Sequence, residues 1–291
     1  MTAIILLLLT FIVNYIMNSI FWSVICFLAA PFSPRLQMMP AGDLSALIFY
    51  LTLASILIPA VLASTNFMQQ SLAWSEGARP ARGEEYQRLL YIFSYVCQKA
   101  GLSQHDFTLC IVNSDALNAF ALGTRYIAVN RGMLQTFPDE EIAGILAHEV
   151  GHIRCGHTRY LLFNMGMNWF TNVTIIVYGI LTTLVNFLAW IPFLGWLIVI
   201  VTSAFNIMIS ILSWVLRIPL NLVTLFGSRR HEYQADAYAC SIGMGPWLAD
   251  GLRHIAGPNG LKKSGFFASL GSTHPDIPDR LEQIQKEIQK Q

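Results

Sequence analysis

The feature that most constrains the fold of this chain is a long run without charged residues. No Asp, Glu, Lys or Arg occurs from Tyr160 to Leu216. A helix needs about 20 apolar residues to cross the hydrocarbon core of a bilayer, so the run is long enough for two crossings. Its middle, I-P-F-L-G at 191–195, is flanked by tryptophans, which favour the headgroup level. We expect a membrane hairpin over 167–216, with helices at about 167–190 and 196–216; a shallow re-entrant hairpin is the alternative.

Two further apolar segments precede this run. They predict transmembrane helices at about 4–30 and 44–62, both within residues 1–64. The link between them holds three prolines and a glycine, as expected for a turn. No Lys or Arg precedes Arg35, which favours an uncleaved helix over a signal peptide. The composition agrees, since only 12% of the residues are charged, whereas soluble domains average about 25%.

Charge distribution predicts an orientation. Four crossings would place the segments 65–166 and 217–291 on one face of the membrane, and of the 18 Lys and Arg residues only Arg35 would lie on the other. Because cytoplasmic loops are rich in basic residues, we expect a multi-pass protein of the cytoplasmic (inner) membrane with both segments in the cytoplasm. A net charge of +1 argues against nucleic acid as a partner. Five scattered cysteines without C-x-x-C predict buried, reduced thiols.

The polar parts of the chain mix the periodicities of helices and strands. They predict an α+β unit in two parts, 65–166 and 217–291, interrupted by the membrane hairpin. The expected elements are a helix at 84–100 that ends at Gly101, strands at 107–112, 118–122 and 125–129, a helix after Pro138, and helices at 228–241, 246–256 and 277–290.

The segment A-H-E-V-G-H at 147–152 carries the strongest chemical signal. His148 and His152 are four residues apart, so on a helix both imidazoles lie on one face and can bind one ion. H-E-x-x-H is the pattern in which zinc proteases place two His ligands and a glutamate that acts as general base. We therefore expect Glu149 to take a proton from a metal-activated water.

A third ligand can be supplied in two ways. The pattern H-E-x-x-H-x-x-G-x-x-H needs Gly at 155 and His at 158, but Cys155 and Thr158 occupy those positions. His157 lies nine residues after His148, so in a continuing helix it would point to the opposite side. We interpret His157 as a helix-end or hydrogen-bonding residue.

The other source is the pattern E-x-x-x-D on a later helix. Glu232 and Asp236 share a helix face, so Glu232 can bind the metal while Asp236 accepts a hydrogen bond from a ligand imidazole. The adjacent His231 points elsewhere, and we assign it a structural role. A site of two His and one Glu leaves a position for water and predicts one Zn²⁺ per chain, although these ligand types also accept other divalent ions.

At this point the chain resembles a known family, the integral-membrane gluzincins that include the bacterial HtpX proteases and the type I CAAX prenyl proteases. The shared motifs are A-H-E-V-G-H at 147–152, R-H-E-Y-Q-A-D-A at 230–237, N-A-F-A-L-G at 118–123, V-N-R-G-M-L at 129–134 and S-T-H-P at 272–275. The layout with four crossings is more similar to HtpX. The resemblance implies a zincin-type fold with zinc held by His148, His152 and Glu232, Glu149 as base and Asp236 in support.

The resemblance also implies where substrate binds. It makes 118–123 the edge strand of the active-site sheet, and an extended peptide can pair with such an edge. The residues concerned are Asn118, Ala119, Phe120, Ala121, Leu122 and Gly123. It further implies that His274 and Arg280 lie near the site and stabilise the oxyanion that forms during attack.

These features predict a membrane-bound zinc endopeptidase with its catalytic face in the cytoplasm, acting in membrane protein quality control. Its substrates would be membrane proteins or unfolded polypeptides, next to the lipid bilayer. Two alternatives stay open: a dedicated processing protease for lipidated or membrane-proximal peptides, and a non-catalytic zinc-binding membrane scaffold on a protease fold. A zinc transporter is disfavoured, because the apolar runs contain no His, Asp or Glu.

Overall fold

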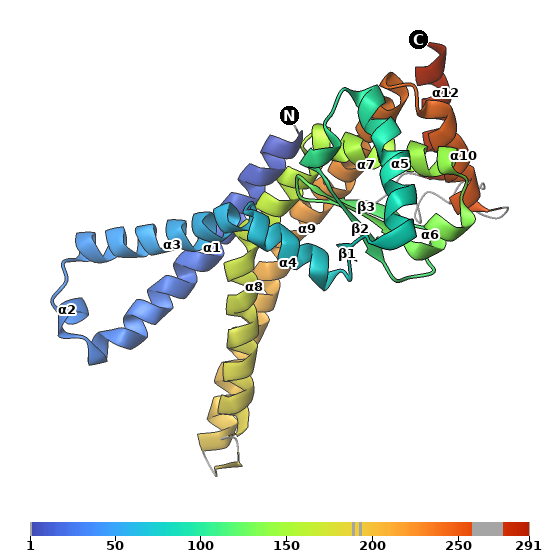
Figure 1. Ribbon diagram of the computed structural model, residues 1–291. Helices are drawn as coiled ribbons and strands as arrows, with labels where there is room; N and C mark the ends of the chain where they lie inside the picture. The colour runs from blue at the N-terminus through green and yellow to red at the C-terminus, as the bar shows by residue number, and fades with distance from the viewer. Residues whose placement is uncertain (1, 188–189, 192–193, 258–275, 291) are drawn as a thin grey trace. The chain divides into compact units, whose positions relative to one another are not determined.

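The computed structural model describes residues 2–187, 190–191, 194–257 and 276–290 (Figure 1). The chain divides into two compact units, which we describe separately. Unit 1 comprises Met1–Ala63 and Phe163–Thr224, and unit 2 comprises Ser64–Leu162 and Leu225–Gln291. The sequence-based limits at 64, 166 and 216 differ from these divisions by one, four and eight residues, and the membrane assignment of each part stays a prediction.

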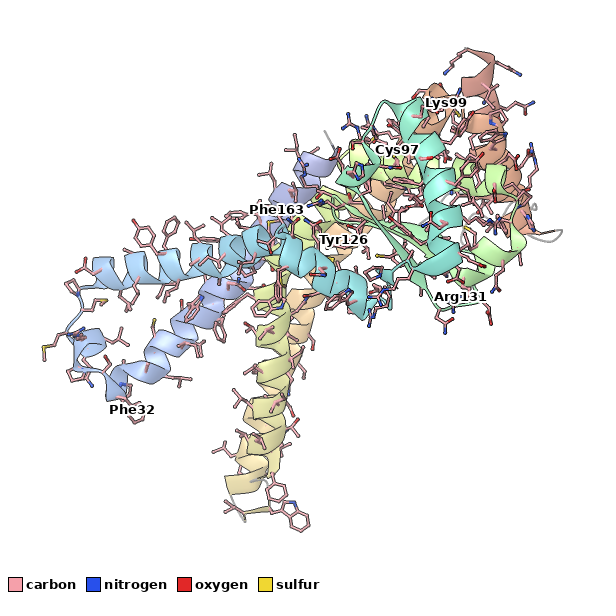
Figure 2. The ribbon with its side chains drawn as sticks, in the orientation of Figure 1. Phe32, Cys97, Lys99, Tyr126, Arg131 and Phe163 are labelled. Atoms are coloured by element: carbon pink, nitrogen blue, oxygen red, sulfur yellow. The ribbon has the colours of Figure 1, made fainter. Side chains whose placement is uncertain are left out.

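Unit 1 is built from helices. Helices α1 and α3 form an antiparallel pair joined through short helical turns, and Phe32, 88% exposed, lies at that turn (Figure 2). Helices α8 and α9 lie side by side (Figure 1), and Thr202 Oγ1 of α9 donates to Asn186 Oδ1 of α8 at 2.8 Å. The elements are α1 (Thr2–Ala29), η1 (Ala30–Phe32), α2 (Pro34–Gln37), α3 (Ala41–Ala63), α8 (His157–Phe187) and α9 (Leu194–Ser241), the last two shared with unit 2.

Three helices among the described residues are long and apolar enough to cross a membrane. They are Ile4–Phe32, Ala41–Ala63 and His157–Phe187, and a shorter apolar stretch, Gly195–Ala204, lies in α9. Many of their large apolar side chains are exposed, including Phe27 at 78%. An apolar surface of this kind is expected where lipid replaces water as the surrounding solvent.

A hydrogen-bonded network joins the helices α1, α3 and α8, the three candidate membrane helices. Thr171 of α8 lies with its Oγ1 2.5 Å from Asn14 Oδ1 and 2.8 Å from Asn18 Oδ1, both in α1. Asn18 Nδ2 donates to Ser55 Oγ of α3 at 3.1 Å, and Asn14 Nδ2 donates to Asn168 Oδ1 of α8 at 3.0 Å. Within an apolar bundle, such bonds between polar side chains hold helices together because lipid offers them no alternative partner.

Unit 2 contains a mixed four-stranded sheet in the order β1-β2-β4-β3. Strand β2 runs parallel to β4, while β1 and β3 are antiparallel to their neighbours, so β3 forms one edge of the sheet. The strands are β1 (Arg79–Pro80), β2 (Thr108–Val112), β3 (Ala119–Leu122) and β4 (Tyr126–Asn130). Gly123, with φ of +63°, permits the tight turn between β3 and β4.

Helices surround this sheet and form the main core of unit 2. Leu89 and Phe93 of α5 pack in one cluster with Ile127 of β4, Leu146 of α7 and Leu248 of α10. The helices are α4 (Asn66–Ser75), α5 (Gly83–Ala100), α6 (Arg131–Thr136), α7 (Asp139–Arg154), α10 (Gly245–Ala256) and α12 (Ile277–Gln289), with η2 (Gln104–Asp106). Burial of such apolar side chains is the main term that stabilises the unit.

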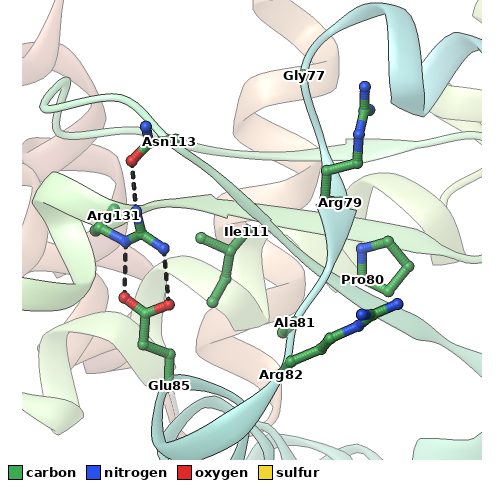
Figure 3. A pocket seen from close by; sticks show the side chains of 9 residues that line it. All are labelled: Gly77, Arg79, Pro80, Ala81, Arg82, Glu85, Ile111, Asn113 and Arg131. Carbon is green, nitrogen blue, oxygen red and sulfur yellow. Dashed lines mark hydrogen bonds and ion pairs between the residues drawn. The ribbon is translucent and has the colours of Figure 1, made fainter.

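An open cavity of about 710 Å³ lies beside β1 and the start of α5 (Figure 3). Across it Arg131 binds both carboxylate oxygens of Glu85, at 2.7 and 3.0 Å, and Asn113 Oδ1 at 2.5 Å. The bidentate pair ties the start of α6 to the first turn of α5. The cavity is also lined by Arg79 and Arg82.

The fold class expected from the sequence is confirmed: apolar helices accompany a small sheet with an edge strand and a helix carrying H-E-x-x-H. Two expected helices, 196–216 and 228–241, instead form the single helix α9. Once a helix has nucleated, each further residue adds one hydrogen bond, so the intervening residues 217–227 need not end it. The short elements α4, β1 and α6 were not expected from the periodicity.

We expect Thr171→Val to weaken unit 1, because valine keeps the shape of threonine but removes the single hydroxyl proton that the Oδ1 atoms of Asn14 and Asn18 share. The loss should be about 1 kcal/mol in the free energy of unfolding measured in detergent micelles. Thr183→Val is the matched control, since Thr183 donates to Gly179 O of its own helix and is exposed. Equal effects of the two substitutions would contradict a stabilising network.

Candidate active site

The helix with the H-E-x-x-H motif, α7, is anchored at its N-terminal end. Three acidic residues in its first turn suit the positive end of the helix dipole. Arg88 of α5 binds Asp139 Oδ1 through Nε and Nη2, at 2.9 and 2.6 Å, and also donates to the carbonyls of Leu134 and Phe137. This arginine therefore sets where α7 begins, while residues 142–151 are buried.

Two glycines of α7 allow other helices to approach its backbone. A Cβ on Gly144 would lie 2.2 Å from the backbone nitrogen of Leu248, so α10 packs directly on α7. A Cβ on Gly151 would lie 3.0 Å from the Cα of Ala235 in α9. Since Ala235 stands between Glu232 and Asp236 in the sequence, this contact brings the two metal motifs together.

Three side chains converge at this helix contact. His148 Nε2 and His152 Nε2 are 3.1 Å apart, and they lie 3.6 and 3.5 Å from the two carboxylate oxygens of Glu232. Among the described residues, His148, His152 and Glu232 form a group whose ligand atoms all lie within 4.8 Å of one another. The structure thus places together the three residues that the sequence suggested as metal ligands.

The spacing and charge of this group fit a bound divalent cation. Metal–ligand bonds of about 2.0–2.2 Å in a tetrahedral zinc site put ligand atoms about 3.3 Å apart, close to the spacing between the two imidazoles and Glu232. Glu149, Glu232 and Asp236 are buried and bring three negative charges, against one positive charge from buried Arg280. A divalent cation would balance the remaining two charges, and buried charges are costly unless they are balanced.

Asp236 contacts His148, the first of the candidate ligands. Its Oδ1 lies 2.8 Å from His148 Nδ1, so that nitrogen carries the proton and His148 Nε2 presents a lone pair toward the metal group. Burial pushes the pKa of Asp236 up, but the hydrogen bonds from His148 and Arg280 outweigh it, so the pKa of this carboxyl is lowered. Asp236 therefore stays ionised near neutral pH.

Arg280 of α12 is buried and bound to two acidic residues of α9. Its Nε and Nη2 donate to the two oxygens of Asp236, at 2.9 and 2.6 Å, and its Nη1 lies 3.2 Å from Glu232 Oε2. Its Nη2 also lies 3.3 Å from His148 Nδ1, but both nitrogens carry protons, so Asp236 is the partner of each. The other residue that the resemblance suggested for the oxyanion, His274, lies outside the described residues.

His157 faces the site, contrary to the side expected for a continuing helix. Helix α7 ends at Arg154, and Gly156, with φ of +78°, turns the chain before α8 begins at His157. As a result His157 Nδ1 lies 3.0 Å from His152 Nδ1, and its Nε2 lies 3.0 Å from Gln234 Oε1. A hydrogen-bonding role was expected, but the direction was not, because the sequence does not show where the helix stops.

His231 packs against the other side of His157. The two rings stack with centroids 4.0 Å apart and an angle of 17° between their planes. The ring of Tyr160 lies edge-on to His231 at 5.9 Å. These contacts agree with a structural role for His231.

Glu149 lies between the metal group and the sheet. Its Oε2 accepts a hydrogen bond from the backbone N–H of Ala121 in the edge strand β3, at 2.8 Å. A cavity of about 440 Å³ lies here, and its polar lining includes His148, His152, His157, Glu149, Glu232 and Arg280. Its apolar lining comes from Leu117, Phe120, Met133, Ile145, Leu161, Leu248, Leu252, Ile255 and Ile277.

The six residues suggested for substrate binding fall on or beside the edge strand. Ala119 to Leu122 form β3, with Asn118 and Gly123 at its two ends. Asn118, Ala119, Phe120 and Ala121 line the cavity. Gly123 does not line this cavity. The turn that it forms packs on Gln69 of α4, whose Oε1 accepts a hydrogen bond from Thr124 N at 2.9 Å.

Four of the five cysteines are buried as expected, and Cys155 is exposed.

Sequence reasoning missed the contributions of Gly151, Ala235 and Gln234. The signal for the first two was the presence of small residues inside both metal motifs, A-H-E-V-G-H and H-E-Y-Q-A-D, which allow close helix packing. Gln234 carried no signal, because its partner His157 is far from it in the sequence.

Comparisons with known proteins agree with this geometry. A family model described as Peptidase family M48 matches residues 84–288. A "Protease HtpX homolog" of Prosthecochloris aestuarii (strain DSM 271 / SK 413) is 30% identical over 237 residues, covering 74% of this chain and 78% of the relative. Another, of Bacteroides fragilis (strain YCH46), is 30% identical over 196 residues, covering 62% of this chain and 56% of the relative.

A solved structure shares the fold. The crystal structure of S. mikatae Ste24p matches with a TM-score of 0.54 at 18% identity, covering 81% of this chain and 58% of that chain. The chain thus spans a little over half the length of this protein and of the Bacteroides relative. Since the family model covers most of the chain and includes both metal motifs, the chain belongs to peptidase family M48 and is HtpX-like.

Proposed function

We propose that this chain is a membrane-bound zinc endopeptidase that cleaves membrane proteins or unfolded polypeptides in protein quality control. The observation that carries the proposal is the convergence of His148, His152 and Glu232 beside Glu149 and an open strand edge. Membership of peptidase family M48 supports it.

The ligands and the base have separate tasks in this proposal. His148 Nε2, His152 Nε2 and one oxygen of Glu232 would hold one zinc ion, which when bound polarises the scissile carbonyl and makes water more acidic. Glu149 accepts the proton from the attacking water and passes it to the departing amine. The Ala121 N–H keeps the Glu149 carboxylate at the sheet edge and so aims it at the scissile bond.

The edge strand β3 would bind the substrate backbone. Asn130 N donates to Asn118 O, so in this antiparallel pair the N–H groups of Ala119 and Ala121 point away from β4. The hydrogen bond from Ala121 N to Glu149 agrees with that direction. An extended peptide alongside β3 would place a side chain in the cavity, whose apolar lining favours an apolar residue there.

Arg280 would act through its neighbours. The oxyanion role suggested by the resemblance stays a prediction, as does that of His274. The guanidinium contacts with Asp236 and Glu232 favour Arg280 as a positioning residue that keeps one carboxylate aimed at His148 and the other at the metal. Arginine suits this task because its planar fork binds a carboxylate through two parallel hydrogen bonds.

The membrane setting follows from the apolar helices. We place the protein in the cytoplasmic (inner) membrane, with four crossings and the catalytic unit in the cytoplasm. The three helices that are long and apolar enough to span support the anchoring. The distribution of Lys and Arg supports the orientation.

We expect Glu149→Gln to abolish casein cleavage by the purified protein while leaving it able to hold zinc, because the amide cannot accept a proton but the three ligands remain. Glu232→Ala should lose both activity and most of the metal, measured by elemental analysis after dialysis. A chelator should inactivate the wild type. Full activity of Glu149→Gln would remove this residue from the mechanism.

We expect Ala121→Pro to reduce kcat/KM at least tenfold, because proline removes the N–H that holds Glu149. A hydrogen bond to a charged group contributes about 1.5–3 kcal/mol, and an edge strand tolerates proline. Ala121→Gly keeps the N–H and serves as the control, with activity expected within about threefold of wild type. Equal activity of the proline variant, at equal melting temperature, would argue against this role of the strand.

We expect a membrane-impermeant maleimide to label Cys155 in inverted membrane vesicles but not in intact spheroplasts of a bacterial host. Cys155 is the exposed cysteine, while Cys26, Cys97, Cys110 and Cys240 are buried. Burial raises the pKa of Cys97, Cys110 and Cys240 to about 11 and also raises the pKa of Cys155, so the exposure of its thiol is what distinguishes Cys155. Cys155→Ser controls for background, and labelling in spheroplasts would reverse the proposed orientation.

A further inference from the structure

His152 and His148 are both supported from α9, but by different routes. Asp236 contacts His148 directly, with its Oδ1 2.8 Å from Nδ1. Gln234, two residues earlier on α9, points to another side of that helix. It reaches His152 through His157, which lies between them with one ring nitrogen 3.0 Å from each partner.

The hydrogen bonds that link His152, His157 and Gln234 can point in only one direction when His152 binds a metal. If His152 Nε2 offers its lone pair to the metal, the ring proton is on Nδ1. His157 Nδ1, 3.0 Å away, is then the acceptor, and the ring proton of His157 is on Nε2. Gln234 Oε1 lies 3.0 Å from that nitrogen and accepts its proton in turn.

We propose that His157, held by Gln234, is a positioning residue that fixes the tautomer and ring orientation of His152 and so raises the affinity of the site for its metal. The proposal rests on the metal site described under the proposed function. In this proposal His157 acts on the metal through His152, whose Nδ1 it contacts, and not as a ligand itself. This is the second imidazole of the site to gain an outer partner, and such partners typically change metal affinity about 10–100-fold.

Packing holds His157 in the position that the proposal requires. The side chain is buried, with 4% of the residue exposed. His231 stacks on its face at 4.0 Å, which leaves the ring edge free to contact His152 and Gln234. The turn at Gly156 sets where α8 begins and thus brings the ring to the site.

The decisive experiment compares zinc affinities of detergent-solubilised variants by competition with a chromophoric chelator. His157→Asn keeps an acceptor near the position of Nδ1, and we expect its dissociation constant to stay within about threefold of wild type. His157→Phe keeps a ring but removes the acceptor, and we expect affinity to fall about 10–100-fold. His231→Phe keeps the stacked ring and should bind zinc as wild type does.

Each result of this comparison decides a different point. Wild-type affinity in His157→Phe would overturn the proposal, and so would an equal loss in the Asn and Phe variants, since the acceptor near the position of Nδ1 would then make no difference. A wild-type protein that binds no zinc would instead overturn the proposed function. The d–d absorption of the Co²⁺-substituted protein should change in His157→Phe and be restored in His157→Asn.

A measurement on the wild type keeps the proposal testable if a variant does not fold. The chain has seven histidines, so ¹⁵N-histidine labelling gives a small set of NMR signals. In the zinc-loaded protein we expect His152 to carry its proton on Nδ1 and His157 on Nε2. A proton on Nδ1 of His157 would overturn the proposal, because that nitrogen could not accept from His152.

Discussion

The candidate site depends on the close contact between α7 and α9 at Gly151 and Ala235. A Cβ on Gly151 would lie 3.0 Å from the Cα of Ala235, so neither position has room for a larger side chain. Glu149 and His152 are neighbours of Gly151 on α7, and Ala235 directly precedes Asp236 on α9. Wider spacing would carry the carboxylate of α9 away from the imidazoles, and metal–ligand bonds of about 2 Å cannot span the difference.

Charge then determines what this contact can hold. Three carboxylates and one guanidinium are buried together, an arrangement that is costly unless each charge finds a partner. Arg280 binds Asp236 and contacts Glu232, and Asp236 accepts from His148. Each candidate metal ligand therefore has a second side chain as its partner: Asp236 for His148, Arg280 for Glu232 and His157 for His152. These partners limit the rotation of the candidate ligands before a metal binds.

The elements with strong local signals were predictable. Helix 84–100 ends at Gly101, which has φ of +64°, and the hairpin turns at Gly123, both as expected. The predicted direction of His157 was wrong, because the prediction assumed that the helix continues past residue 154. In the structure α7 ends at Arg154. The joining of 196–216 and 228–241 into α9 was also missed, since a helix once formed passes through residues that would not start one.

The sequence alone determined the apolar segments, the types of the candidate ligands and their spacing, because each of these depends only on residues close together in the chain. A spacing of four puts His148 and His152 on one face of any helix, and likewise Glu232 and Asp236. Only the tertiary structure decided that these two faces meet, that Ala121 holds Glu149 and that His157 joins Gln234 to His152. Those contacts link residues distant in the chain, and packing of whole helices and the sheet sets them, which no local pattern records.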